Sequence, residues 1–387
     1  MPNKIPYSTQ SINNSDIKAV VSTLKSGFLS QGPTTLKFEK EMSKLTKSKY
    51  AISANSATSG LHLVCLALGL SKKDLVWVSS ISFVATANCA AHCDSKIDFV
   101  DINKDTFNIC VKSLEQKLKI AKKNKKLPKI LIVVHLGGLP SDMKKINKLS
   151  KKYKFEIIED ASHALGSTHN NLPVGSCKYS IASIFSFHPV KIATTAEGGV
   201  ITTNSKKLNH KIRIFREHGI ERTRKNLVNK KNKFELYYEQ QGLGHNYKLS
   251  EVHASLGLSQ IKRVKFFIQK RNLLKNIYIN KLKGLPISFQ KIPKNFYSSF
   301  HLMIIRVHKN LRNKLYESFK KNNIRTNVHY LPIFMHPFYY NKKHLNNKNS
   351  LDYYNEALSI PLYVDLKKKE QKKIIRIIFN FFKERIK

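Results

Sequence analysis

Residues 130–160 read ILIVVHLGGLPSDMKKINKLSKKYKFEIIED, and this stretch decides the fold class. Its first apolar run is typical of a strand covered on both faces of a parallel sheet. Gly137–Pro140 turns the chain, and an amphipathic helix follows with Ser141 or Asp142 as its N-cap. A second apolar run ends at Asp160. Because such a crossover is right-handed and makes its two strands parallel, the stretch predicts an α/β fold.

The end of the second strand is a candidate ligand site. We expect Asp160 at the same edge of the sheet as His135, since neighbouring parallel strands end together. α/β proteins bind ligands at that edge. Two interpretations stay open: Asp160 belongs to a ligand site, with His163 three residues further on, or it caps a short helix at Ala161–Gly166.

Lys191 is the candidate catalytic residue. It lies in FSFHPVKIATTAEGG, residues 185–199, between a predicted strand that Pro189 ends and a second strand at Gly199–Thr203. This order places one lysine at a sheet end. Burial lowers the pKa of a lysine, and the neutral amine can form a Schiff base with an aldehyde. The alternative is a solvated surface lysine, which is the common case in a chain so rich in Lys.

A candidate anion site lies earlier in the chain. Asn55–Ser59 is small and polar, and it separates a predicted strand at Tyr50–Ser53 from a buried helix at Gly60–Leu70. The first N–H groups of a helix are unpaired and its dipole is positive at that end, so this start is suited to a phosphate. The same residues would serve equally well as a Ser/Thr N-cap.

The formal net charge of +44 admits a nucleic-acid-binding protein. The basic residues are spread along the whole chain, however, which favours a solvated surface that also attracts small anionic substrates. No apolar run reaches the length of a membrane helix, and the first residues lack the apolar core of a signal peptide. We therefore expect a cytoplasmic protein.

The five cysteines form no CxxC pair, so we expect them to be reduced and buried. The histidines lack the spacing of metal ligands, and no metal site is predicted. Elsewhere, apolar spacing predicts a helix at Ser15–Ser26 with Ser15 as its N-cap. Arg222–Glu239 is predicted to be a long mobile loop, and Thr326–Tyr330 to be a strand. A break at Gly284–Pro286 precedes a smaller C-terminal domain.

The separate candidates fit one cofactor. An aldehyde on a pyridine ring with a phosphate arm needs a lysine, a carboxylate for the ring nitrogen, an aromatic side chain to stack on the ring, and an anion site. Lys191, Asp160, Phe83 and the helix start at Asn55–Gly60 supply these groups. The carboxylate raises the pKa of the pyridine nitrogen and keeps it protonated.

The chain resembles the DegT/StrS-type nucleotide-sugar aminotransferases, which use pyridoxal phosphate (PLP). Motifs of this family keep their order and spacing along most of the chain. They are FLSQGP (28–33), NSATSGLH (55–62), ISFVATAN (81–88), HLGGLPSDM (135–143), EDASHALGS (159–167), FSFHPVKIATTAEGG (185–199), GLGHNYKLSEVHASLGLSQ (242–260) and NVHYLPIFMHPFYY (327–340).

The resemblance implies an α/β protein of the type I PLP-dependent aminotransferase fold, with a mostly parallel sheet between helices and a smaller C-terminal α/β domain. Residues 1–250 would form the N-terminal segment and the large PLP-binding domain. Residues 251–387 would form the linking helices and the smaller domain. The active unit would be a homodimer.

The resemblance also assigns roles by position. Lys191 would form the Schiff base and carry the proton between substrate and cofactor, Asp160 would pair with the pyridinium, and Phe83 would stack on the ring. The remaining cofactor contacts would come from Thr58, Ser59 and Ser186 at the phosphate, His163 near the cofactor oxygen, and Asn246 of the neighbouring subunit.

Within the family, the segments IPYSTQSI (5–12), NSATS (55–59), YYEQQGLGHNYKLS (237–250) and VHYLPI (328–333) resemble members that act in pseudaminic acid biosynthesis. This implies transfer of an amine from glutamate to C4 of a UDP-linked 4-keto-6-deoxy-N-acetylhexosamine. The family pattern is broken at Ala196, where glycine is frequent, and at His245 and Lys248, where Tyr and Arg are common. The differences at His245 and Lys248 concern contacts to the sugar or between subunits.

Three alternatives remain. The chain could aminate another nucleotide-linked keto sugar. It could be a sugar dehydratase on the same fold, although those members carry histidine in place of Lys191. It could also be a basic nucleic-acid-binding protein on an inactive fold, against which the retention of Lys191, Asp160, Phe83 and Ser186 argues.

Overall fold

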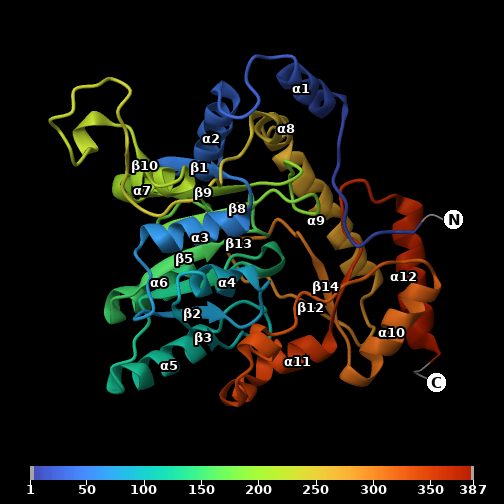
Figure 1. Ribbon diagram of the computed structural model, residues 1–387. Coiled ribbons are helices and arrows are strands. Elements are labelled where there is room, and N and C mark those ends of the chain that lie inside the picture. Colours follow the sequence, from blue (N-terminus) through green and yellow to red (C-terminus); the bar gives the residue numbers. More distant parts are fainter. Residues whose placement is uncertain (1–3, 385–387) are drawn as a thin grey trace.

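A mostly parallel sheet forms the centre of the molecule in the computed structural model (Figure 1). The structure describes residues 4–384, and in this part the sheet has seven strands in the order β1-β9-β8-β5-β4-β2-β3. β9 is antiparallel to both of its neighbours, and the other pairs are parallel. The strands are β1 (Tyr50–Ala54), β2 (Leu75–Ser79), β3 (Lys96–Val100), β4 (Ile130–Val134), β5 (Glu156–Asp160), β8 (Ala182–Ser186) and β9 (Gly199–Thr203).

The predicted strand–helix–strand unit is confirmed. β4 and β5 lie side by side and parallel, and α6 (Met143–Tyr153) connects them. Asp142 caps this helix, because its side chain accepts a hydrogen bond from the Lys145 N–H at 3.2 Å. Asp160 is the last residue of β5, so its carboxylate lies at the carboxyl end of the parallel strands.

Alternating side chains of β4 divide the core into two layers. Ile130 and Ile132 pack in one buried cluster with α3 (Ala57–Ala67), α4 (Ala85–Ala91) and α7 (Lys206–Arg216). Leu131 and Val133 pack in a second cluster with α5 (Val111–Lys123) and α6. Successive strand residues point to opposite faces, so a continuous apolar run is what a sheet covered on both sides requires.

The second half of the chain builds a separate, smaller sheet. Its strands pair antiparallel in the order β12-β14-β15. A buried cluster joins this sheet to α9, α10 and α12, and Ile5 near the N-terminus pairs with Ile324 in the same region. The elements are α8 (Glu251–Ile261), α9 (Val264–Lys281), β12 (Ser288–Phe289), β14 (Met303–Arg306), α10 (Lys309–Lys321), α11 (Lys348–Glu356), β15 (Ala357–Ile360) and α12 (Lys368–Lys383).

Short elements complete the fold. A small sheet places β6 (Thr168–His169) between β13 (Phe296–Tyr297) and β7 (Leu172–Pro173). β10 (Ile220–Glu221) and β11 (Glu239–Gln240) form the base of a segment that extends away from the body (Figure 1). The predicted loop at Arg222–Glu239 is this segment, and it includes one short 3-10 turn at Arg224–Asn226.

Some local predictions are wrong, and each has a local cause. Asn13, and not Ser15, caps α1 (Asn14–Leu24), because Asn13 and Asp16 form a reciprocal capping box. Thr326–Tyr330 is not a strand, since only Asn327 forms a bridge, to Ser359.

Two further predictions need correction near the sheet. No helix forms at Ala161–Gly166, which is a series of turns. Asp160 therefore accepts the N–H of Ser162 within a turn and caps no helix. The predicted helix at Gly60–Leu70 begins earlier, at Ala57, because Ser56 is its N-cap.

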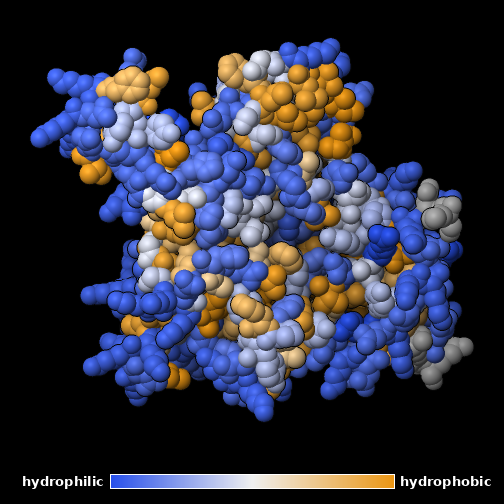
Figure 2. Space-filling model, in the orientation of Figure 1, coloured by the Kyte–Doolittle hydropathy of each residue, from blue (hydrophilic) through white to orange (hydrophobic). Residues whose placement is uncertain are grey.

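Apolar side chains gather on one part of the surface, over α1, the loop after it, and α2 (Pro33–Thr46). Figure 2 shows the part of this patch that covers α1. We call it the α1–α2 patch; its exposed residues are Ile12, Ile17, Val21, Leu24, Phe28, Leu29 and Leu36. Within residues 4–384, no helix has the length and hydrophobicity needed to cross a membrane.

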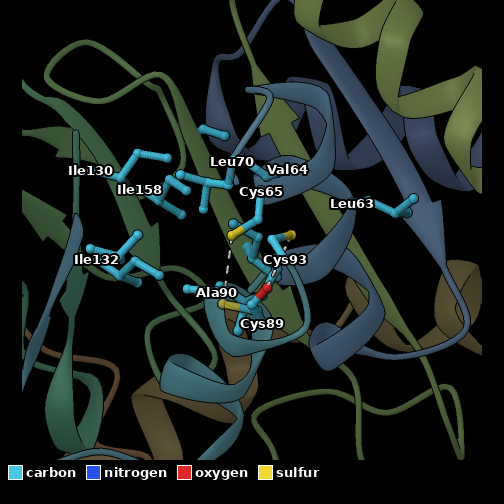
Figure 3. Packing of buried hydrophobic residues seen from close by; sticks show 14 of the residues in the cluster. Leu63, Val64, Cys65, Leu70, Cys89, Ala90, Cys93, Ile130, Ile132 and Ile158 are labelled. Atoms are coloured by element: carbon cyan, nitrogen blue, oxygen red, sulfur yellow. Dashed lines mark hydrogen bonds between the residues drawn. The ribbon is translucent and has the colours of Figure 1, made fainter. Parts of the chain in front are cut away.

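The five cysteines are free thiols, as predicted. Cys65, Cys89 and Cys93 meet in the core between α3, α4 and the sheet (Figure 3), with 3.7 Å between the Sγ atoms of Cys65 and Cys89. Burial raises the pKa of the Cys93 thiol to about 11. The Cys93 thiol therefore remains protonated, and the three buried side chains pack as small hydrophobic residues.

Candidate active site

A cavity of about 450 Å³ opens at the carboxyl ends of β4, β5 and β8. It lies between the large sheet and the smaller C-terminal part, because residues 301 and 327–330 close it from the other side. Most of the predicted site residues meet in its lining. These are Thr58, Phe83, Asp160, His163, Ser186 and Lys191.

Asp160 is held in one orientation at the floor of the cavity. Its Oδ2 accepts the Thr86 hydroxyl at 2.7 Å, and its Oδ1 accepts the Ser162 N–H at 3.1 Å. Thr86 in turn contacts the Ser82 hydroxyl at 2.6 Å. Thr86 was not predicted from the sequence, although it lies three residues after Phe83 in the same motif. A carboxylate fixed in this way can face a positively charged ring nitrogen.

Lys191 lies in the loop between β8 and β9, within the field of Asp160. Burial lowers the pKa of the Lys191 amine to about 8, and the Asp160 carboxylate partly opposes this shift. The loop itself is fixed by backbone hydrogen bonds, from the Lys191 N–H to the His188 carbonyl and from the Thr195 N–H to the Phe187 carbonyl, both 2.9 Å. Lys191 thus combines accessibility from the cavity with an amine that is neutral in a substantial fraction of molecules near pH 8.

The first turn of α3 faces the cavity with Thr58, which is exposed there, while Ser59 is buried and does not line the cavity. Ser59 instead bonds within the turn, through its N–H to the Ser56 hydroxyl at 3.0 Å and through its own hydroxyl to Asn55. Gly199 makes this arrangement possible, because a Cβ there would lie 2.4 Å from the Ser56 carbonyl oxygen. The helix start therefore packs directly against β9.

Phe83 is 57% exposed, which is unusual for a phenylalanine and leaves one large apolar face toward the cavity. Its ring centroid is 5.9 Å from that of Tyr330. Ser186, the last residue of β8, is partly buried, and its hydroxyl accepts the His188 N–H at 3.4 Å. An aromatic face and a hydroxyl thus line the same cavity as Lys191 and Asp160.

Histidines and a tyrosine form the wall opposite the sheet. His301 is buried with its ring 4.4 Å from the ring of His163, and His329 donates to or accepts from Ser359 through Nδ1 at 2.9 Å. Tyr330 contacts the Nε2 of His163 at 3.1 Å. The sequence reasoning missed His301, His329 and Tyr330. The only available signal for His329 and Tyr330 is the VHYLPI segment (328–333), which carries the family resemblance and overlaps the predicted strand at Thr326–Tyr330.

Asn246 does not line this cavity. It is exposed, and its backbone pairs with that of Glu217. Its neighbour Tyr247 accepts the Asn55 N–H at 2.9 Å, so the 242–250 segment lies against the start of α3. The structure therefore leaves the Asn246 side chain directed at solvent, available to a second molecule.

The fold and the lysine–carboxylate pair in the cavity define a PLP-dependent aminotransferase of the type I fold. The model of the DegT/DnrJ/EryC1/StrS aminotransferase family matches residues 10–379, and the chain belongs to this family. Its cofactor is PLP. The site fits this cofactor because the pKa of the Lys191 amine is lowered, the Asp160 carboxylate is held by a hydrogen bond from Thr86, and the helix start at Thr58 is open to the cavity.

Relatives match nearly the whole chain. A UDP-4-amino-4,6-dideoxy-N-acetyl-beta-L-altrosamine transaminase from Campylobacter jejuni is 37% identical, with 98% of each chain covered. An uncharacterized protein from Methanocaldococcus jannaschii is 35% identical, with 91% of each chain covered.

Solved structures agree with the fold. PseC from Helicobacter pylori, an aminotransferase involved in pseudaminic acid biosynthesis, is 32% identical, covers 99% of this chain and 100% of its own, and has a TM-score of 0.88. A putative sugar aminotransferase from Streptococcus pneumoniae in its pyridoxamine phosphate form is 27% identical, covers 98% and 99%, and has a TM-score of 0.89.

Proposed function

We propose that the protein transfers an amino group from glutamate to C4 of a UDP-linked 4-keto-6-deoxy-N-acetylhexosamine of the L-altrose type, in the cytoplasm, for pseudaminic acid biosynthesis. The observation that carries this proposal is the likeness along nearly the whole chain to the C. jejuni altrosamine transaminase and to the H. pylori pseudaminic acid enzyme. The coarser assignment, a sugar aminotransferase, does not depend on it.

The roles of the site residues belong to the same proposal. Bound in the cavity, PLP supplies the aldehyde that accepts the amine and a ring that withdraws electrons. Asp160 orients the ring nitrogen and holds its proton, while Phe83 covers the ring face. Thr58 and Ser186 bind the phosphate beside the start of α3, where Ser59, expected at the phosphate, instead holds the turn through its bonds to Ser56 and Asn55. His163 lies near the ring oxygen. Lys191 moves the proton at the reacting carbon.

We further propose that the active unit is a homodimer. Within the described residues, Lys191 is the only lysine or arginine that lines the cavity. The cofactor phosphate, the substrate diphosphate and the two carboxylates of glutamate are all anionic, so one protomer offers little cationic charge for them. The exposed Asn246 is suited to reach a neighbouring site, and the α1–α2 patch offers apolar surface for the contact.

The proposed division of the chain follows the same logic. Residues 1–250 would carry the N-terminal segment and the PLP-binding sheet, and residues 251–387 the linking helices and the domain that closes the cavity. The supporting observation is that the large sheet is complete at β9, before α8 begins.

The substrate is tested by incubating the protein with PLP, glutamate and each of two UDP-linked 4-keto sugars, one of the L-altrose type and its C5 epimer. Mass spectrometry of the nucleotide sugars measures the amine transferred. We expect amination of the first sugar to exceed that of its epimer by at least about tenfold. A preference for the epimer, or for neither sugar, would point to another nucleotide-linked keto sugar.

The dimer is tested by mixing two inactive variants, Lys191→Ala and Asn246→Ala, after partial unfolding and refolding together. If Asn246 completes the neighbouring site, half of a random mixture is mixed dimers in which one of two sites is intact. Activity should then return to about a quarter of the wild-type value. No recovery in a mixture shown by mass to contain mixed dimers would contradict the shared site.

A further inference from the structure

The backbone turn at Gly137 determines which ring nitrogen of His163 carries no proton. The Gly137 N–H points at the His163 Nδ1 at 3.3 Å. A backbone N–H can only donate, so Nδ1 is the acceptor and carries no proton. Gly137 is committed to this place because its φ of +67° is a conformation that glycine adopts without strain. The turn is itself anchored, since its carbonyl accepts the Leu302 N–H.

His163 remains neutral in this position. Burial, the positive charge of Lys191 and the neighbouring His329 hold the pKa of the His163 ring well below its ordinary value. A neutral imidazole has one proton, and with Nδ1 as acceptor that proton is on Nε2. Nε2 therefore donates to the Tyr330 hydroxyl oxygen at 3.1 Å. The opposite direction would require a ring with no proton on either nitrogen.

The Tyr330 proton is then left for a ligand. Its oxygen already accepts from His163, and within residues 4–384 no acceptor for the Tyr330 O–H is found. The side chain is partly exposed and lines the same cavity as Lys191. Burial raises the pKa of Tyr330, so the hydroxyl stays protonated at any pH at which the enzyme works.

We propose that Tyr330 is a catalytic residue whose hydroxyl donates a hydrogen bond to the ketone oxygen of the amine acceptor, with Gly137 and His163 as positioning residues that set the direction of this bond. The inference rests on the proposed keto-sugar acceptor. Donation to this oxygen makes the carbonyl carbon more electrophilic, and it strengthens as negative charge develops on the oxygen.

The first experiment compares Tyr330→Phe with the wild type and with Tyr278→Phe. Tyr278 is a matched control, because its buried hydroxyl donates to the Pro361 carbonyl at 2.9 Å, in the core of the C-terminal part. Transfer from the pyridoxamine form to the UDP-linked keto sugar is followed in single turnovers. We expect Tyr330→Phe to slow this step by about a hundredfold and Tyr278→Phe by less than about threefold.

Two other readouts separate the proposed role from a structural one. The pH titration of the visible band of the PLP-loaded protein should be unchanged in Tyr330→Phe, since the hydroxyl acts on the substrate. A shifted titration would place the hydroxyl on the cofactor and overturn the proposal. In cofactor-free protein with ¹⁵N-labelled histidine, the His163 signals should show a proton on Nε2, and Tyr330→Phe should shift that signal.

The outcomes are distinguishable from failure of the proposed substrate. A wild-type protein that aminates no UDP-linked keto sugar overturns the substrate, and the kinetic comparison then moves to the keto sugar that is accepted. If the wild type aminates the keto sugar and Tyr330→Phe does so at the same rate, the proposed role of Tyr330 is wrong. A proton on Nδ1 of His163 would show that Gly137 does not set the tautomer of this ring, and would overturn its role as a positioning residue.

Discussion

The cavity has two walls that are built in different ways. The sheet wall, which carries Asp160, Ser186 and Lys191, stands on strand ends whose positions are set by backbone ladders. The facing wall, residues 327–330 with His301, has no regular structure. Side chains hold it in place, as when the Tyr353 hydroxyl donates to the His329 carbonyl at 2.6 Å.

This difference suggests that the sheet wall supplies the reacting groups and the facing wall sets the geometry around the substrate. On the sheet wall a side chain can be replaced while the backbone ladder keeps its shape, so a substitution there removes a chemical group and little else. On the facing wall each side chain also positions its neighbours, so a substitution changes the geometry presented to the substrate. The effects of variants on the two walls should therefore differ in kind, and the following changes test the sheet wall.

The largest expected effect is that of Lys191→Ala. The amine that moves the proton is lost, so turnover should fall by at least about a thousandfold, and the visible band of lysine-bound PLP should be absent. Absorbance spectra and steady-state rates measure both. Lys206→Ala, at the exposed start of α7, is the control and should behave as wild type. If Lys191→Ala kept its turnover, Lys191 would not be the catalytic residue and the assignment of the chemistry to the sheet wall would be wrong.

Asp160→Asn should reduce turnover by roughly 100- to 1000-fold, because an amide cannot hold the proton on the ring nitrogen. It should also lower the pKa of Lys191 below its value of about 8, since the carboxylate that favours the charged amine is gone. The pH dependence of lysine modification in cofactor-free protein measures this. Thr86→Val keeps the carboxylate and loses only the hydrogen bonds of the Thr86 hydroxyl to Asp160 and Ser82, so its loss of turnover should stay below about tenfold.

Lys191→Met should stabilise the cofactor-free protein. The pKa of Lys191 is lowered from 10.5 to about 8 in the folded state, so below pH 8 folding retains the full cost of a buried cation. That cost disappears as the pH rises from about 8 to about 10.5, where the unfolded chain binds the extra proton. Urea unfolding at pH 7 should therefore show a gain of about 3 kcal/mol that vanishes near pH 10.5. A gain independent of pH would indicate packing instead.

The smallest effect concerns Ala196, which stands where the family often has glycine. Its φ of +65° lies in the left-handed region that favours glycine. Ala196→Gly should raise the free energy of unfolding by about 0.5–1 kcal/mol, the relief of strain being partly offset by the flexibility of glycine in the unfolded chain. Ala193→Gly, at a buried position of ordinary conformation, should lower it by about 1 kcal/mol. Equal effects in urea unfolding would show that the loop carries no strain.

The sheet wall could be predicted from sequence because its signals are local. Residues 130–160 contain an apolar run, a turn and an amphipathic helix, and this pattern predicts the second strand. The end of that strand gives the position of Asp160. Lys191 follows from the break at Pro189 in the same way. The roles of Thr58 and Ser186 could be assigned only through the family resemblance, and the roles of Thr58, Phe83 and Ser186 at the cofactor remain proposals.

The facing wall could not be predicted in this way. Tyr330 meets His163 across 167 residues of chain, and His329 is placed by Ser359 in β15. No periodicity in Thr326–Tyr330 reports such contacts, and its β-branched and aromatic residues resemble a strand. Tertiary contacts decided the conformation there. Ser59 shows a different kind of error. The sequence motif correctly predicts its place at the start of a helix, but its side chain bonds to Asn55 at that helix start and does not line the cavity.

The pairing of Ile5 with Ile324 has a consequence for the order of events during synthesis. Tyr7 lines the cavity, and its carbonyl accepts the Leu362 N–H at 3.1 Å, so Ile5 and Tyr7 reach their partners only after residues 324–362 have been synthesised. The large sheet, complete at residue 203, can form long before. The cofactor pocket is thus closed only after residue 362 has been synthesised, and we expect a chain truncated before that point to keep the sheet but lack the closed pocket.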